Sequence, residues 1–178
     1  GKGIAGVAVS DGYSVVKTDA NGVYQFAGSR YAKTVFISLP ADYQVPLDAN
    51  KKPAFYKVGI TRNQVNRNDF KLTPLTESEE NFTFVAIGDP QCANDKEVSR
   101  YQNETINDIV NTLSSNQIAG KYKNAYAMTL GDIVNDTPEM WEKLVASMEN
   151  VQIGSNKFLP IFQCIGNHDH NAEYSSAY

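Results

Sequence analysis

The chain has 178 residues, of which 42% are hydrophobic and 20% charged, and these values are typical of a globular protein rather than a disordered one. No apolar run approaches the roughly 18–20 residues that a membrane-spanning helix needs, so a membrane span is not expected. The net charge of −4 is unevenly divided: residues 1–73 carry 10 Lys and Arg against 5 Asp, whereas the remaining residues carry 6 against 15 Asp and Glu. This asymmetry predicts two units of different character. The basic residues of the first part are scattered, which argues against nucleic acid as a partner.

The first 73 residues predict an all-β domain. Residues 4–12 and 13–19 alternate small or apolar side chains with polar ones, and Asn21-Gly22 then supplies the positive φ that a tight turn needs. Short stretches of the same kind follow at residues 23–26, 33–40, 54–60 and 66–72. Because none of these stretches has helical periodicity, we expect a small β-sandwich.

The runs GVAVSDG (residues 6–12) and TDANGVYQF (residues 18–26) resemble those of transthyretin-like or carboxypeptidase-regulatory-like sandwich domains. This resemblance implies a location outside the cytoplasm, that is, periplasmic, secreted or at the cell surface. We interpret the aromatic side chains of this part as core and edge packing rather than as a platform for sugars. They are Tyr13, Tyr24, Phe26, Phe36, Phe55 and Tyr56.

Residues 74–81 predict a linker, since they are polar, contain three glutamates and begin with proline. From residue 82 to residue 178 the pattern changes to apolar strands that alternate with amphipathic helices. Apolar runs predict strands, and the last of them is expected to be continuous and buried on both faces. The strands are expected at residues 82–87, 125–130 and 158–165.

Two helices are expected between these strands. The first covers residues 97–115, where apolar side chains recur at spacings of three and four. The second begins at Pro138, with Thr137 as its N-cap. The order βαβαβ predicts a parallel sheet with right-handed crossovers. The chain as a whole is therefore expected to be multi-domain, with an all-β sandwich followed by an α/β portion.

Polar residues follow each of the three predicted strands. Asp89 comes after the first, Asp132 after the second, and Asn167-His168-Asp169 after the third. Any one of these side chains could simply cap a turn. Because the carboxyl ends of parallel strands meet at one edge of a sheet, the sequence predicts that they converge there into a site.

Cys92 and Cys164 are the only cysteines. Two cysteines are too few for a disulfide scaffold, so buried unpaired thiols are expected, with a single bridge between the two as the alternative.

The three strand ends, Gly-Asp, Gly-Asp and Gly-Asn-His-Asp, resemble the first half of the calcineurin-like metallophosphoesterases, over about 97 residues. The resemblance implies two divalent metal ions, with Asp132 bridging the pair, Asp89 on the first ion and Asn167 on the second. It also implies that His168 contacts the substrate beside Asn167 and stabilises or protonates the leaving oxygen. Asp169 is expected to orient His168 or its loop by hydrogen bonding.

The sequence departs from the family pattern at Gln91, because Asp89-Pro90-Gln91 stands where the family has Asp-x-His. Gln91 is interpreted as a metal ligand or as a residue that hydrogen-bonds to the metal ligands. The alternative is that it only forms a hydrogen bond within its own loop. The metal could be Mn, Mg, Fe or Zn, and the hard amide oxygen favours Mn or Mg.

The second departure is that His168 and His170 are the only histidines, whereas the family draws further histidines from its second half. His170 is expected to be exposed and not a ligand. We therefore expect incompletely bound metals, and expect the rest of the catalytic domain, or another polypeptide, to supply the missing ligands. The predicted function is hydrolysis of a phosphoester by metal-activated hydroxide, although this chain alone is expected to be poorly active. The alternative is a non-catalytic surface or binding protein that uses the sandwich, with a decayed or truncated phosphoesterase half.

Overall fold

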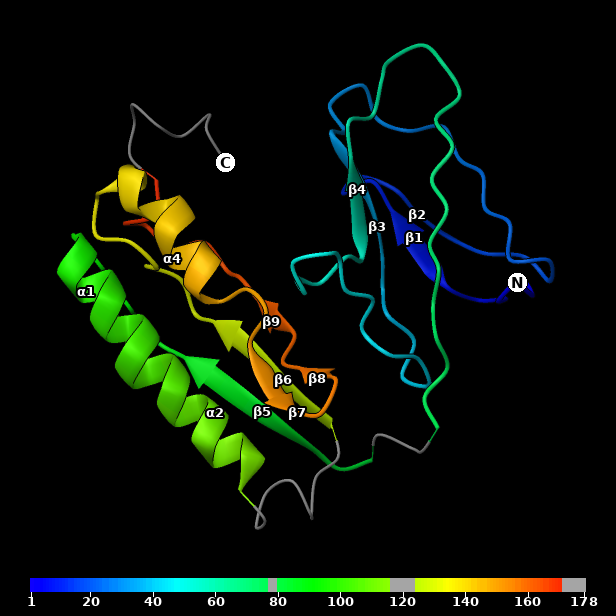
Figure 1. Ribbon diagram of the computed structural model, residues 1–178. Helices are drawn as coiled ribbons and strands as arrows, with labels where there is room; N and C mark the ends of the chain where they lie inside the picture. Colours follow the sequence, from blue (N-terminus) through cyan, green and yellow to red (C-terminus); the bar gives the residue numbers. More distant parts are fainter. Residues whose placement is uncertain (77–79, 116–123, 171–178) are drawn as a thin grey trace. The chain divides into compact units, whose positions relative to one another are not determined.

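The computed structural model describes residues 1–76, 80–115 and 124–170 (Figure 1). The chain divides into two compact units, one formed by Gly1–Leu47 with Ala54–Ser78 and the other by Asp48–Pro53 with Glu79–Tyr178. In the described stretches, no helix has the length and apolar character that crossing a membrane would require.

The first unit is built on one antiparallel sheet of four strands, in the order β2-β1-β3-β4. The strands are β1 (Ala8–Ser10), β2 (Val15–Lys17), β3 (Thr34–Ile37) and β4 (Tyr56–Val58). Residues 1–76 are described without a gap and contain no helix. The β-rich character of the first part is therefore confirmed, whereas the second sheet of a sandwich stays a prediction.

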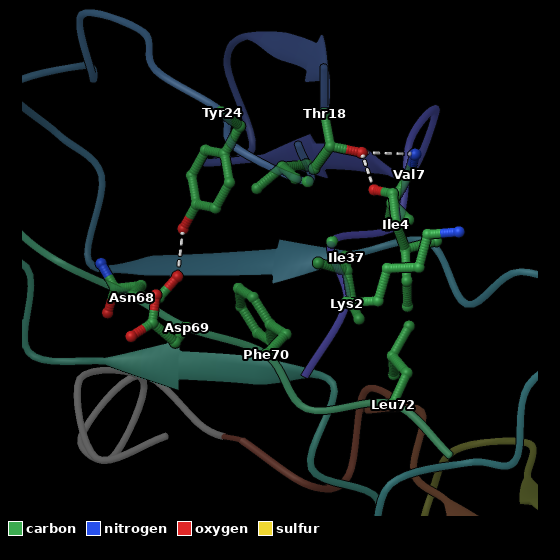
Figure 2. Close-up of a pocket in the computed structure, with 13 residues that line it drawn as sticks. Lys2, Ile4, Val7, Thr18, Tyr24, Ile37, Asn68, Asp69, Phe70 and Leu72 are labelled. Carbon is green, nitrogen blue, oxygen red and sulfur yellow. Dashed lines mark hydrogen bonds between the residues drawn. The ribbon is translucent and has the colours of Figure 1, made fainter. Parts of the chain in front are cut away.

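The core of the first unit lies on one face of this sheet. Val9 of β1 is paired with Ile37 of β3, and both side chains are buried. Two extended segments cover this face with Tyr24, Phe26, Phe70 and Leu72. Figure 2 shows how they are joined: the Tyr24 hydroxyl donates to the backbone oxygen of Asn68 at 2.7 Å. A cavity of about 150 Å³ remains between the sheet and these segments.

The aromatic residues of the first unit do not all pack as expected. Tyr24, Phe26 and Phe55 pack against the core. Tyr13 is 64% exposed and Tyr56 is 48% exposed, so neither lies in the core, but Tyr56 is on the edge strand β4 with its ring centroid 5.4 Å from that of Phe55. Tyr13 lies in the turn between β1 and β2. Tyr56 pairs with Phe36, whose neighbours in β3 point into the core, so its side chain lies on the opposite face.

The second unit contains a parallel sheet in the order β5-β6-β9, formed by β5 (Phe82–Ile87), β6 (Asn124–Thr129) and β9 (Ile161–Phe162) (Figure 1). The first helical stretch runs from α1 (Asp95–Arg100) through a π-helical segment, η1 (Tyr101–Ile106), into α2 (Asn107–Ser114). The second consists of the 3₁₀ turn η2 (Pro138–Met140) and α4 (Trp141–Ser147). Both stretches pack on one core with the sheet, through residues such as Val98, Leu144 and Ala127. The α/β character of this part is therefore as expected.

The third predicted strand is not continuous. Residues 158–165 were expected to form one buried strand, but Pro160 divides them. β8 (Lys157–Phe158) pairs with β7 (Gln152–Gly154) in a separate antiparallel sheet, and only β9 joins β6. Proline has no N–H to donate, and its carbonyl accepts instead from Ala127 at 2.9 Å. Residues 163–165, which follow β9 directly, are exposed, and Cys164 is one of them.

Candidate active site

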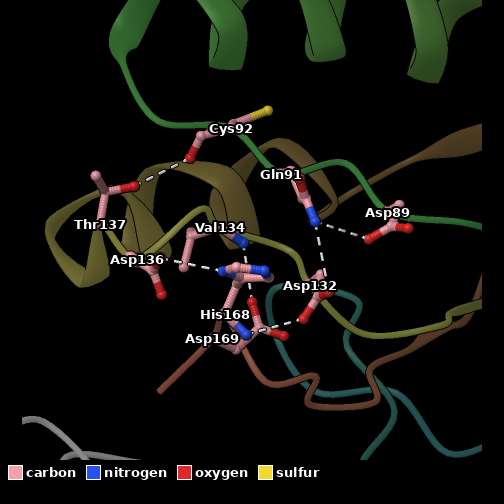
Figure 3. Close-up of polar contacts among 9 residues, drawn as sticks. All are labelled: Asp89, Gln91, Cys92, Asp132, Val134, Asp136, Thr137, His168 and Asp169. Atoms are coloured by element: carbon pink, nitrogen blue, oxygen red, sulfur yellow. Dashed lines mark hydrogen bonds and ion pairs between the residues drawn. The ribbon is translucent and has the colours of Figure 1, made fainter. Parts of the chain in front are cut away.

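The loops that follow β5, β6 and β9 are joined by backbone hydrogen bonds. The N–H of Gln91 donates to the oxygen of Asp132 at 2.9 Å, and that of Cys92 donates to Ile133 at 3.3 Å. The N–H of Asp136 donates to the oxygen of His168 at 3.2 Å. The carboxyl ends of the three parallel strands therefore meet at one edge of the sheet (Figure 3).

Two glycines allow the loops after β6 and β9 to approach closely. Gly131 has a φ of +94°, and a Cβ atom there would lie 2.9 Å from the Cα of Gly166. A Cβ atom at Gly166 would lie 2.1 Å from Oδ1 of Asp132. No side chain fits at either position without displacing its neighbour. Glycine is therefore required on steric grounds at the positions directly before Asp132 and Asn167.

Gln91 brings the two predicted metal ligands of the first two loops together. Its Nε2 atom donates to Oδ1 of Asp89 at 3.2 Å and faces Oδ2 of Asp132 at 3.5 Å (Figure 3). The N–H of His168 donates to the other oxygen of Asp132 at 2.9 Å, and this bond holds the pKa of Asp132 below its usual value. Two carboxylates thus face one point, where an amide nitrogen with partial positive charge sits between them.

His168 has a carboxylate partner that the sequence did not indicate. Nδ1 of His168 lies 3.1 Å from Oδ2 of Asp136, in the loop after β6. This hydrogen bond raises the pKa of His168 above its usual value, and the charges of Asp136, Asp132 and Asp89 act in the same direction. The only sequence signal for Asp136 was its place in a strand-end loop, four residues after Asp132. The residues that follow it predict the beginning of a helix, and this pattern gives no sign of a partner for His168.

Asp169 is fully buried, with an exposed fraction of 1%. Its Oδ1 atom accepts from the N–H of Val134 at 2.9 Å, and its Oδ2 atom accepts from that of Gly166 at 2.8 Å. Asp169 therefore fastens the loop after β9 to the loop after β6, while the imidazole of His168 is held by Asp136. Asn167 is exposed and has no hydrogen-bond partner among the described residues.

Thr137 also joins two loops. It was expected to cap the following helix, but its side chain makes no capping hydrogen bond there. Its hydroxyl donates instead to the backbone oxygen of Cys92 at 3.2 Å. Thr137 therefore occupies the N-cap position before Pro138, as expected, but its hydroxyl does not cap the helix because a neighbouring loop offers it an acceptor.

Backbone strain is concentrated at the candidate site. Eight non-glycine residues in the described part of the chain have a positive φ, and Asp89, Gln91, Asp132 and Asp136 are four of them. Their φ values lie between 42° and 54°, in the left-handed region that side chains disfavour. Such conformations gather where a fold holds functional groups in place.

The donor set suits a hard divalent cation, since two carboxylates converge with an amide that can offer its oxygen. The number of donors falls short of a pair of cations. Among residues 1–76, 80–115 and 124–170, no three His, Cys, Asp or Glu side chains form a group that could hold a metal ion. The described residues therefore fit part of a metal site, and further ligands would be needed to complete it.

Cys92 does not add a ligand to this site. Both thiols are free, with Cys92 buried and Cys164 exposed, so the bridge considered from the sequence is not formed. Burial raises the pKa of the Cys92 thiol, with a further contribution from Glu97. The thiol therefore stays protonated at neutral pH, and a protonated thiol is a poor metal ligand.

Comparison with known families places part of the first unit in a described family model. Residues 1–75 match the model described as the N terminal of Calcineurin-like phosphoesterase. No curated protein and no solved structure matches the chain. The match supports a relationship to the calcineurin-like phosphoesterases, a metal-dependent hydrolase family. It covers residues that contain none of the three strand-end motifs, so it is independent of the motif argument.

Proposed function

We propose that the second unit carries part of the active site of a metal-dependent phosphoester hydrolase. The observation that carries this proposal is the convergence at one sheet edge of Asp89, Gln91 and Asp132 with the His168–Asp136 pair. The family match over residues 1–75 supports it independently. A carboxylate cluster next to a held imidazole combines a place for cations with a proton donor, which phosphoester hydrolysis requires.

Four side chains would hold the metals. Asp132 would bridge two ions, Asp89 would bind the first and Asn167 the second. Gln91 would bind the first ion with its amide turned so that Oε1 faces it. When bound, the ions would neutralise charge on the phosphoryl oxygens and activate a water molecule.

His168 would act on the leaving oxygen. Because Nδ1 is held by Asp136, Nε2 is the ring nitrogen that remains for the substrate. The raised pKa keeps a larger fraction of the imidazole protonated near neutral pH, which suits a general acid. Asp169 would position both loops without touching the substrate.

The remaining ligands would come from residues outside the described part of the chain or from another polypeptide.

We also propose that the protein acts outside the cytoplasm, on the basis of the resemblance of its first part to extracytoplasmic sandwich domains. The alternative function is non-catalytic binding through the first unit.

Binding of Mn²⁺ to the 178-residue chain, followed by the EPR signal of free Mn²⁺, tests the proposed site. We expect weak binding that Asp132→Asn lowers at least tenfold, because the bridging carboxylate loses its charge. Asp108→Asn, on an exposed position of α2, is the matched control and should bind as the parent does. Equal Mn²⁺ affinity of Asp132→Asn and the parent would contradict the metal role.

Hydrolysis of a generic aryl phosphate with added Mn²⁺ tests whether the site needs further ligands to be active. We expect a slow rate from this chain, because its described donors are too few for two cations. A high rate that Asp132→Asn abolishes would contradict the need for further ligands.

A further inference from the structure

Two tyrosine rings and an arginine form an exposed cluster on the first unit. Tyr13 and Tyr31 are 64% and 56% exposed, with ring centroids 6.4 Å apart and planes inclined by 42°. The guanidinium of Arg30 lies 4.6 Å from the centroid of the Tyr31 ring and donates to the Tyr31 hydroxyl. We call Tyr13, Arg30 and Tyr31 the tyrosine platform.

The tyrosine platform is held by a buried carboxylate. Asp11 is only 5% exposed, and its Oδ1 atom accepts from the N–H groups of Tyr13 at 3.0 Å and Ser14 at 2.8 Å. Its Oδ2 atom accepts from Ser29 at 2.7 Å, and the Ser29 hydroxyl accepts from the N–H of Tyr31 at 3.2 Å. One side chain thus fixes both segments that carry the rings, although they are distant in sequence.

The exposure of two neighbouring tyrosine rings on the first unit suggests that they contact a ligand. Large aromatic side chains normally bury their area, and here two are exposed next to each other on an ordered backbone. Tyr and Arg are also the residue types that contribute most of the energy in recognition sites. A surface whose side chains are already ordered loses less conformational entropy when it binds.

The chemistry of the platform indicates its ligand. Ring faces bind the C–H faces of saccharide rings, and the two hydroxyls and the guanidinium donate to oxygen atoms. A carboxylate would also pair with Arg30, in a part of the chain that carries 10 basic residues against 5 acidic ones. We propose that the tyrosine platform binds an acidic oligosaccharide, in which uronic acid rings pack on Tyr13 and Tyr31 and a carboxylate pairs with Arg30.

Single-stranded nucleic acid fits these observations less well. It requires several cations along a groove to neutralise successive phosphates, whereas the platform contains one guanidinium. The proposed binding does not depend on the residues around Asp132.

Isothermal titration of the 178-residue chain with an oligogalacturonate tests the proposal. We expect Tyr13→Ala and Tyr31→Ala each to weaken binding about tenfold, as is typical of the truncation of an aromatic residue that contributes to a binding site. Arg30→Ala should weaken it by a similar factor and reduce its salt dependence. Tyr56→Ala and Arg67→Ala, exposed residues of the same types outside the platform, are matched controls and should bind as the parent does.

The same titrations with a neutral glucan and a single-stranded oligonucleotide separate the alternatives. Absence of oligogalacturonate binding, or binding that the platform variants leave unchanged, would overturn the proposal. Equal affinity for the neutral glucan would overturn its acidic specificity, and tighter binding of the oligonucleotide would overturn the ligand class. Thermal unfolding of each variant checks that the fold is kept, as is expected for exposed side chains.

Discussion

Asp11 in the first unit and Asp169 in the second are both buried carboxylates that accept backbone N–H groups, yet they hold different kinds of surface. Asp11 joins the turn after β1 to Ser29 and so orders the rings of the tyrosine platform. Asp169 joins the loops after β6 and β9 and so brings His168 next to Asp132 and Asp136. In both units a buried carboxylate fixes the backbone of the segments that carry the candidate functional groups. The loops that Asp169 joins differ from the segments that Asp11 joins, because they also need glycines at close approach and residues with positive φ.

The largest effect is expected for Asp169→Ala. It leaves the buried N–H groups of Val134 and Gly166 without an acceptor, and each such loss costs roughly 1–3 kcal/mol, so the free energy of unfolding should fall by about 4 kcal/mol. Trp141 is the only tryptophan and lies in the second unit, so its fluorescence during urea denaturation measures this change. Asp108→Ala on the surface of α2 is the control. A loss for Asp169→Ala below about 1 kcal/mol would show that water or a neighbouring group replaces the carboxylate.

The glycines beside the two buried carboxylates, Asp11 and Asp169, differ in the space around them. Gly166→Ala places a Cβ atom 2.1 Å from Oδ1 of Asp132, so we expect a loss of about 3 kcal/mol in unfolding free energy and weaker Mn²⁺ binding. Gly28→Ala is the matched change beside Asp11, where the new Cβ atom would lie 3.5 Å from Oδ2 at ordinary contact distance. It should therefore stay within about 1 kcal/mol of the parent. Similar losses for both variants would remove the contrast between the two units.

Asp11→Asn should lower the stability of the first unit by about 2 kcal/mol at neutral pH, because a neutral amide accepts the three N–H groups less well. Burial disfavours the charged carboxylate, but these N–H donors outweigh it and hold the pKa of Asp11 below 3.8. The stabilisation is therefore present above pH 3.8 and is lost as the pH falls through the lowered pKa. Amide hydrogen exchange of β1 and β3 at several pH values measures it. A difference between Asp11→Asn and the parent that stays constant down to the lowest pH would contradict the assignment.

The smallest effect is expected at His168. Asp136→Asn removes the charge that raises the pKa of the imidazole, so the pKa measured by NMR titration should move down toward 6.5. The pair is partly exposed, so its effect on stability should be the smallest of the four. Because the pKa is raised on folding, this contribution is complete below pH 6.5 and disappears as the pH rises through the raised value. Asp169→Asn, although more destabilising, should move the His168 pKa less than Asp136→Asn does.

The expected ligands of the candidate site came from local patterns. An apolar strand followed by Gly-Asp is visible in any short window, and the parallel order of strands then places Asp89 and Asp132 at one edge. The interruption at Pro160 was also visible, because proline cannot donate to a strand ladder, but the apolar character of the run outweighed it in the prediction. The turn residues Gly154-Ser155-Asn156 could likewise have indicated the hairpin of β7 and β8.

The sequence by itself determined the β-rich first part, the α/β second part and the carboxylates that end the first two parallel strands, because each depends on a period of two or of three to four residues along the chain. Only the tertiary structure decided that Asp136 rather than Asp169 holds the imidazole of His168. It also decided that Tyr13 lies beside Tyr31 rather than in the core. These pairs join loops that are far apart in sequence, and the distance between two loops depends on how strands pack and how closely their glycines let them approach. No local period encodes that distance.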